Sequence, residues 1–350
     1  MPLLARMLAA PMVIDVRPGA VASLGNLLAD RRIATSGRVA VAVGPSQGDS
    51  IAAELEIDGA EIFRVPDGTH DTAVRLGKRL RAGHYEALAG IGGGRTIDVT
   101  KFAASMAGIP MIAVATNLAH DGIASPTSSL EHESGKGSYG VMMPVAVLVD
   151  LDRVRCAPQP LATAGIGDVL SNLSAVADWE LSAADTGEHV DGLAAAMSRS
   201  AAQAVLHQPG AAMSEEFLTL LAEALILSGM ASAVAGSTRP ASGGDHEIMH
   251  AIDQLYPGTA SHGELAGVGA VFCAFLREDE SQVRLLSGCL ARHGLPRTPA
   301  DLGLSHADFT KAVVFAPETR PGRYTILERL ALTEAQIADR VEEYARAISG

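Results

Sequence analysis

The segment Gly90-Ile91-Gly92-Gly93-Gly94-Arg95-Thr96-Ile97-Asp98 decides how the first half of this chain folds. The apolar run 87–91 is typical of a buried strand, and a helical pattern follows the glycines to about residue 107. Glycines in such a turn let the backbone approach a pyrophosphate, and free amides at the helix start attract negative charge. The spacing is not GxGxxG, and a tight turn without a ligand is the alternative. The strand–turn–helix context favours nucleotide binding.

Further apolar runs on both sides of this turn predict a sheet. They are short and alternate with helical patterns at 52–55 and 72–82, and they cover 13–16, 39–43, 61–65, 111–115 and 145–150. Strands that are apolar throughout and separated by helices indicate a parallel sheet covered on both faces. The first half is therefore predicted to be a Rossmann-like α/β domain.

The sequence changes character after Pro158 and Pro160. Strand-like runs give way to alanine- and leucine-rich helical patterns at 169–184, 192–206 and 215–234. We predict an α/β domain over residues 1–155 and an all-α domain over residues 156–350. Ligands often bind between domains, so a cleft between these two is expected.

A polar loop follows the predicted strand 111–115. Its sequence is Thr116-Asn117-Leu118-Ala119-His120-Asp121-Gly122-Ile123-Ala124-Ser125-Pro126. Ligands in open α/β sheets bind at the carboxyl ends of the strands, which is where this loop would lie. A loop rich in turn-forming residues is the alternative, and its position favours a functional role.

A third group of motifs predicts a metal site in the helical half. Gly243-Gly244-Asp245-His246-Glu247-Ile248-Met249-His250 is followed by His262-Gly263-Glu264. A helix would place His246 and His250 on one face, and imidazole is a common zinc ligand. Asp168, in Gly165-Ile166-Gly167-Asp168, could complete a three-ligand site with an open position. Spacing alone does not distinguish His246 from His250 as the ligand.

Composition narrows the function further. The 350 residues are 48% hydrophobic and 19% charged, with a net charge of −13 and no lysine–arginine cluster. These values indicate a globular protein that does not bind nucleic acid, although a small anionic substrate fits. The three cysteines form no CxxC motif, which favours free thiols in a reducing compartment. Residues 1–12 lack the basic region of a signal peptide, and we expect no membrane-spanning run and a cytoplasmic location.

The motifs GIGGGRTID, NLAHDGIASP, GIGD and SGGDHEIMH followed by HGE resemble, in this order, the dehydroquinate synthase-like superfamily of iron-containing alcohol and glycerol dehydrogenases. Within it, the chain looks most like the sn-glycerol-1-phosphate dehydrogenase family. The resemblance runs from residues 13–14 to the HGE motif. It implies a dehydroquinate synthase-like fold, an NAD or NADP cofactor, a divalent metal such as Zn²⁺ and a homo-oligomer. The implied reaction interconverts dihydroxyacetone phosphate and sn-glycerol 1-phosphate.

The resemblance also implies roles for individual residues. Asp168, His246 and His262 match metal ligands, while Asp121 and His250 match catalytic residues that contact the substrate. The residues that match cofactor contacts are Gly92, Gly93, Gly94, Arg95, Thr96, Asp98, Thr116, Asn117, Ala119 and Ser125. Arg95 stands where relatives commonly have lysine, and Asp245 where glutamate is usual; both changes keep the charge. For a substrate phosphate Arg239 is a candidate, with a structural ion pair as the alternative.

Two other activities compete with this interpretation. A dehydroquinate synthase-like enzyme uses the same cofactor and metal, but it needs several basic residues and its relatives carry glutamate where this chain has Asp168. With only four lysines, the chain does not favour that reaction. A dehydrogenase acting on a non-phosphorylated polyol or ketone shares every motif. Gly44-Pro45-Ser46 offers neither an acid for a ribose nor a base for a 2′-phosphate, so NAD and NADP stay open.

Overall fold

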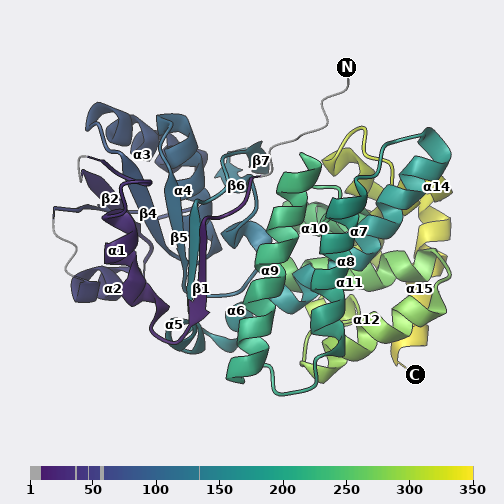
Figure 1. Cartoon of the computed structure of the whole chain (residues 1–350). Helices are drawn as coiled ribbons and strands as arrows, with labels where there is room; N and C mark the ends of the chain where they lie inside the picture. Colours follow the sequence, from purple (N-terminus) through teal and green to yellow (C-terminus); the bar gives the residue numbers. More distant parts are fainter. Residues whose placement is uncertain (1–8, 36–37, 46, 56–58, 134, 350) are drawn as a thin grey trace. The chain divides into compact units, whose positions relative to one another are not determined.

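The computed structural model describes residues 9–35, 38–45, 47–55, 59–133 and 135–349. It consists of two compact units that meet in the sequence between Ala162 and Thr163 (Figure 1). Ser46 and residues 1–8, on which the cofactor and signal-peptide expectations partly depend, lie outside the described residues. Each unit is described by itself.

Unit 1 is an α/β domain. Its strands are β1 Val13–Arg17, β2 Val39–Val43, β3 Glu61–Arg64, β4 Ala87–Gly92, β5 Met111–Ala115, β6 Thr127–His132, β7 Gly135–Gly140 and β8 Ala146–Asp150. Its helices are η1 Ala20–Ser23, α1 Leu24–Leu28, α2 Gln47–Leu55, α3 His70–Ala82, α4 Gly94–Ala107, η2 Asp121–Ile123, α5 Leu151–Arg155 and α6 Gln159–Thr163, the last of which ends one residue into unit 2.

The main sheet has six parallel strands in the order β1-β8-β5-β4-β2-β3. The inner strands β2, β4, β5 and β8 are buried at every position because both faces of the sheet are covered, whereas the edge strands β1 and β3 carry exposed residues. Val41 and Ile91 pack on one face with residues of α1 and α2, such as Leu24 and Ile51. On the other face α4 approaches Gly90 so closely that a Cβ there would lie 2.3 Å from the Thr100 hydroxyl oxygen. The six predicted strands are confirmed, as is the α/β fold class.

A hairpin of unit 1 was not predicted. Strands β6 and β7 form an antiparallel hairpin outside the main sheet. Alternate residues of β6, including Ser128 and Leu130, are buried, while β7 is largely exposed and contains Gly135, Gly137 and Gly140. Glycine disfavours strands, so no strand pattern marked β7 in the sequence.

Unit 2 is built of helices. They are α7 Gly165–Thr186, α8 Gly192–His207, α9 Glu215–Ala235, α10 Gly244–Leu255, α11 His262–Leu276, α12 Glu280–Arg292, η3 Ala300–Leu302, α13 His306–Phe315, η4 Ala316–Thr319, α14 Ile326–Leu330 and α15 Glu334–Ser349. The helical patterns predicted at 169–184, 192–206 and 215–234 are confirmed as α7, α8 and α9.

Helix α9 corrects one expectation. An 18-residue window of this 21-residue helix has a mean hydropathy of 1.9, so by length and composition alone the helix could cross a membrane, and the expectation that no apolar run is long enough was wrong in that respect. The helix packs against α7 and α8, and 61% of its apolar window is buried in the structure. This burial is typical of a core helix in a large globular domain.

Candidate functional site

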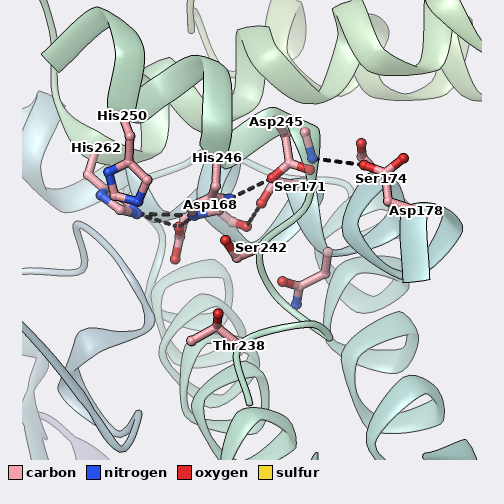
Figure 2. Close-up of polar contacts among 12 residues, drawn as sticks. Asp168, Ser171, Ser174, Asp178, Thr238, Ser242, Asp245, His246, His250 and His262 are labelled. Atoms are coloured by element: carbon pink, nitrogen blue, oxygen red, sulfur yellow. Dashed lines mark hydrogen bonds and ion pairs between the residues drawn. The ribbon is translucent and has the colours of Figure 1, made fainter. Parts of the chain in front are cut away.

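Three predicted metal ligands come together in unit 2. Asp168 lies in the first turn of α7, His246 in the first turn of α10, and His262 begins α11. The Oδ1 atom of Asp168 lies 3.6 Å from Nε2 of His246 and 3.2 Å from Nε2 of His262, and the two Nε2 atoms are 3.3 Å apart. Figure 2 shows the three side chains pointing toward one another. Asp168 and His246 are buried, and the His262 side chain is 29% exposed.

These distances fit a metal ion. Donor atoms about 2.1 Å from a tetrahedral ion are about 3.4 Å apart, which is close to the three separations found here. Two imidazoles and one carboxylate suit several divalent transition metals, including zinc and iron. Among the described residues, this is the group of histidine, cysteine and carboxylate side chains whose donor atoms lie close enough to share an ion.

Close contacts between glycines bring the three helices together. A Cβ on Gly167 would lie 2.1 Å from the carbonyl oxygen of Gly263, and one on Gly267 would lie 3.1 Å from Cα of Gly167. On the other side of α11, a Cβ on Gly269 would lie 2.5 Å from the carbonyl oxygen of Asp245. Helices can approach this closely only where side chains are missing. Asp168 and His262 are sequence neighbours of Gly167 and Gly263, so these contacts set their separation.

The ring of His246 is oriented by the residue before it. Its Nδ1–H donates to Oδ2 of Asp245 at 2.5 Å, which leaves Nε2 directed at Asp168 and His262. Such a carboxylate–histidine pair fixes the tautomer of a metal ligand. Burial alone would lower the pKa of His246, but its bonds to Asp168 and Asp245 outweigh burial and raise it to about 9. The two histidines correspondingly hold the pKa of Asp168 below its usual value against the effect of burial.

The buried carboxylate of Asp178 anchors the start of α10. It accepts the Gly244 amide at 2.8 Å and the Ile326 amide at 3.0 Å, and it pairs with Arg277 at 2.7 Å. Gly243 provides no side chain to cap α10, so Asp178 on α7 replaces the usual capping group. The bond ties the helix that carries His246 to the helix that carries Asp168.

His250 lies one turn after His246, and their ring centroids are 6.4 Å apart. Its Nε2 atom accepts a hydrogen bond of 2.7 Å from Nη2 of Arg320. A guanidinium only donates, so this ring nitrogen carries no proton and the proton of a neutral ring sits on Nδ1. One carboxylate oxygen of Asp168 and one ring nitrogen each of His246 and His262 lie within 4.8 Å of one another. The geometry thus groups His246, rather than His250, with the other two donors.

Arg239 was the candidate for binding a substrate phosphate, with a structural ion pair as the alternative. In the structure it forms an ion pair with a carboxylate. It is buried and donates from Nε and Nη2 to the two carboxylate oxygens of Glu188, at 2.9 and 2.5 Å. Its Nη1 donates to the Tyr324 carbonyl at 2.9 Å. A bidentate pair with a carboxylate satisfies this arginine within the protein.

The glycine turn of unit 1 lies where the strand order reverses. From β2 the chain runs to β3 at one side of the sheet, and from β4 it runs to β5 and β8 at the other. The neighbouring ends of β2 and β4 therefore form the switch point at which ligands of such sheets bind. Gly44 follows β2, and both Gly44 and Gly92 adjoin the Thr96 hydroxyl, to which an added Cβ would come within 2.3 and 2.7 Å.

The start of α4 fits an anionic ligand. Gly93 occupies its N-cap position and, having no side chain, does not cap the amides of the first turn. Added Cβ atoms on Gly93 and Gly94 would lie 2.4 Å from Nδ2 of Asn117 and 2.2 Å from Nε2 of His120. The Oδ1 atom of Asn117 is buried and has no hydrogen-bond partner. Uncapped amides beside an unpartnered amide oxygen are what a nucleotide cofactor could satisfy.

The other predicted cofactor residues differ in burial. Thr116 and Ser125 are buried, Ala119 and Asn117 are partly buried, and Arg95 is exposed. Asp98 differs from them because its buried carboxylate pairs with the buried Lys101 at 3.1 Å. Lys101 also donates to the carbonyls of Ser125 and Thr127 and so ties this loop to α4. Asp121 begins η2, and its carbonyl accepts the Ser125 amide at 3.0 Å.

Several known proteins are similar to this chain in sequence. The pattern of the family described as "Iron-containing alcohol dehydrogenase" matches residues 15–158. "Glycerol-1-phosphate dehydrogenase [NAD(P)+]" of Methanothermobacter thermautotrophicus is 34% identical over 345 residues, which cover 97% of this chain and 98% of that protein. The chain belongs to the glycerol-1-phosphate dehydrogenase family. Another family member, from Pyrococcus furiosus, is 36% identical over 87% of this chain and 89% of its own length.

Solved structures agree on the fold of this family member. A probable glycerol dehydrogenase from Sinorhizobium meliloti superimposes with a TM-score of 0.81 at 22% identity, covering 99% of each chain. A sulfoacetaldehyde reductase from Bifidobacterium kashiwanohense, in complex with NAD+, gives 0.72 at 16% identity over 98% of this chain and 99% of that one. The fold expected from the sequence motifs is that of these structures, and the chain is an oxidoreductase of the glycerol-1-phosphate dehydrogenase family.

Sequence reasoning missed several residues at these sites. Arg320 contacts His250 but lies in none of the motifs. The one feature of the sequence that could have drawn attention to it is a second arginine, Arg323, which follows Arg320 after a Pro-Gly pair. Lys101 falls within the helix after the glycine turn, where a lysine would ordinarily face solvent. Asp178 lies in an alanine-rich helical stretch and was not distinguished from surface acids.

Proposed function

We propose that this chain is a metal-dependent NAD(P)-linked dehydrogenase that interconverts dihydroxyacetone phosphate and sn-glycerol 1-phosphate. The observation that carries the proposal is the Asp168–His246–His262 cluster, in a chain that aligns over nearly its full length with the glycerol-1-phosphate dehydrogenase of M. thermautotrophicus. A cytoplasmic location and a homo-oligomer remain predictions.

Asp168, His246 and His262 would hold the divalent cation, with Asp245 fixing the ring of His246. We take the cation to be Zn²⁺, although the same donors suit Fe²⁺. Gly92, Gly93 and Gly94 would let the pyrophosphate of NAD or NADP reach the first amides of α4. Thr96, Thr116, Asn117, Ala119 and Ser125 would line the cofactor, with Arg95 at the rim. Asp98 would act through its ion pair with Lys101, which supports the loop.

When bound, the cation would polarise the substrate carbonyl as a Lewis acid, and the nicotinamide would exchange hydride with its carbon. The chain's own residues position the reactants and handle the proton. His250, unprotonated at Nε2, carries its proton at Nδ1 when neutral and can donate it to a substrate oxygen. Asp121 would accept a hydrogen bond from a substrate hydroxyl group. Helix α10 holds His246 and His250 on one face and thereby keeps the metal ligand and the proton donor in register.

The test is NADH and NADPH oxidation by protein loaded with Zn²⁺ or Fe²⁺. Dihydroxyacetone phosphate and dihydroxyacetone are supplied as alternative substrates, and the chirality of the product is determined. Steady oxidation with a preference for the phosphorylated ketone, yielding sn-glycerol 1-phosphate, is expected. Turnover of dihydroxyacetone alone, or of neither ketone by protein that binds metal and cofactor, would reject the proposed substrate.

A further inference from the structure

Two arginines of unit 2 lie near His250 without a carboxylate partner. Arg320 and Arg323 are both partly buried, and neither forms an ion pair within the part of the chain that the structure describes. Arg239 and Arg277, which are similarly enclosed in the same unit, each pair with a carboxylate. The carboxyl groups of Asp245 and Glu247 act on both arginines only from beyond ion-pair distance. Positive charge withdrawn from water without a directly paired anion is costly. The difference suggests that an anion from outside the chain completes the environment of Arg320 and Arg323.

Both guanidinium groups converge on one hydroxyl. The Oγ1 atom of Thr238 accepts from Nη2 of Arg323 at 2.9 Å and lies 3.5 Å from Nη1 of Arg320. Arg323 also donates to the carbonyl of Ser242, just before α10. Thr238 and Ser242 lie on the segment that leads into the helix of His246, as Figure 2 shows. The two positive charges are thus fixed beside the proposed metal ligands rather than at a distant surface.

Arg320 lies close to the residues proposed to bind the reacting end of the substrate. Its Nη2 atom lies 2.7 Å from His250, whose ring centroid is 6.4 Å from that of His246. A ligand that reaches the metal cluster with its carbonyl would extend past His250 toward this guanidinium. A phosphate attached two atoms from that carbonyl would be within reach of it, and guanidinium groups bind phosphate oxygens in pairs.

We infer that Arg320, supported by Arg323, binds the phosphate group of the substrate and makes the enzyme select the phosphorylated ketone. This inference rests on the proposed function, of which it names the specificity-determining residue. A neighbouring cavity of about 630 Å³ is a less suitable place for the phosphate. Arg323 and Arg239 line it, but so do the carboxylates Glu188 and Glu328. Arg239 is moreover already neutralised by Glu188.

A structural role for Arg320 makes a different prediction. If Arg320 only orients His250, its loss should slow turnover of phosphorylated and non-phosphorylated ketones alike. If it also binds phosphate, its loss should weaken binding of the phosphorylated ketone well beyond any effect on the non-phosphorylated one. A hydrogen bond to a charged group contributes enough that its removal should weaken binding about 10- to 100-fold. Binding of inorganic phosphate should fall as well, and this measurement does not depend on activity.

The experiment compares Arg320→Gln, Arg320→Lys and the exposed control Arg284→Gln in metal-loaded, full-length protein. We measure the KM for dihydroxyacetone phosphate and for dihydroxyacetone, the Kd of inorganic phosphate by calorimetry, NADH binding and metal content. The inference expects Arg320→Gln to raise the first KM and the phosphate Kd about 10- to 100-fold, with NADH binding and metal content unchanged. Arg320→Lys should recover part of the loss, and Arg284→Gln should behave as wild type.

Unchanged phosphate affinity in Arg320→Gln, or equal losses with both ketones, would overturn the inference. If Arg320→Gln does not fold, the Kd of inorganic phosphate is measured for Arg320→Lys, because a lysine keeps the charge but not the paired donors. A Kd higher than that of wild type supports the inference, and an unchanged Kd overturns it. A wild-type protein inactive on dihydroxyacetone phosphate would reject the proposed function. In that case, loss of phosphate binding in Arg320→Gln would still support the anion site, and its retention would reject it.

Discussion

Gly167 on α7 lies against the carbonyl of Gly263 on α11, where a Cβ on Gly167 would be 2.1 Å from that oxygen. The contact leaves no room for a methyl group, since the opposing atom belongs to the backbone. Gly167→Ala should therefore separate the two helices and with them Asp168 and His262. We expect a metal affinity at least about tenfold lower, because ligand geometry sets metal affinity. Equilibrium dialysis followed by metal analysis measures it.

Gly288→Ala is the matched control for this substitution. Gly288 lies within α12, is exposed, and an added Cβ would meet no atom within 4 Å. Alanine favours a helix over glycine by about 0.5–1 kcal/mol, so this variant should be slightly more stable and bind metal normally. Normal metal binding by Gly167→Ala would show that the close contact does not set the ligand separation.

Asp245→Ala should weaken metal binding without removing a ligand. The substitution takes away the acceptor of the His246 Nδ1–H, which lies 2.5 Å from Oδ2 of Asp245. Without it, the ring can rotate and change tautomer, and loss of such a partner typically costs about 10- to 100-fold in affinity. Asp245→Glu keeps a carboxylate at this position and should restore part of the metal affinity. Glu223→Gln, on the exposed side of α9, controls for the loss of one negative charge.

The sequence predicted the parts of the fold that depend on periodicity. Apolar runs such as 39–43 and 111–115 are buried on both faces, so their composition alone marks them as strands. The hairpin strand β7 was missed because it is glycine-rich and exposed. The three proposed metal donors, which the structure brings together, could be picked out because His246 and His262 lie in closely spaced motifs and Asp168 stands in a third motif. Asp178 and Arg320 were not picked out, because their roles arise from contacts with residues 66 or more positions away, such as Gly244 and His250.

Metal binding should strengthen as pH rises. In the metal-free protein the pKa of His246 is raised to about 9, mainly because its bonds to Asp168 and Asp245 outweigh burial. At pH 7 to 8 this imidazole is therefore protonated, and an ion must displace the proton to bind Nε2. We expect about one proton released per ion and a metal affinity that rises up to about pH 9. Calorimetry in buffers of different ionisation enthalpy measures the proton number.

The stability of the metal-free protein should change in the opposite direction. A pKa raised in the folded state above the ordinary value of 6.5 contributes stability that is fully present below pH 6.5 and is lost as pH rises through about 9. Urea unfolding between pH 6 and 10 should show this loss in wild type and a smaller one in His246→Gln. A metal affinity independent of pH over this range would contradict the assigned protonation of His246.

Gly93→Asp should separate cofactor binding from stability. Gly93 is the N-cap residue of α4, with φ −82° and ψ −176°, a backbone conformation that any residue adopts and that N-cap residues prefer. An aspartate there can cap the helix amides, so the protein should stay at least as stable, even though the Asn117 amide must move aside. The same carboxylate would occupy the amides proposed for the pyrophosphate and repel its charge. NADH affinity, measured by fluorescence titration, should fall at least about tenfold, while metal content is unchanged. Gly93→Ser caps without a charge and should lose less, and full NADH affinity in Gly93→Asp would place the pyrophosphate elsewhere.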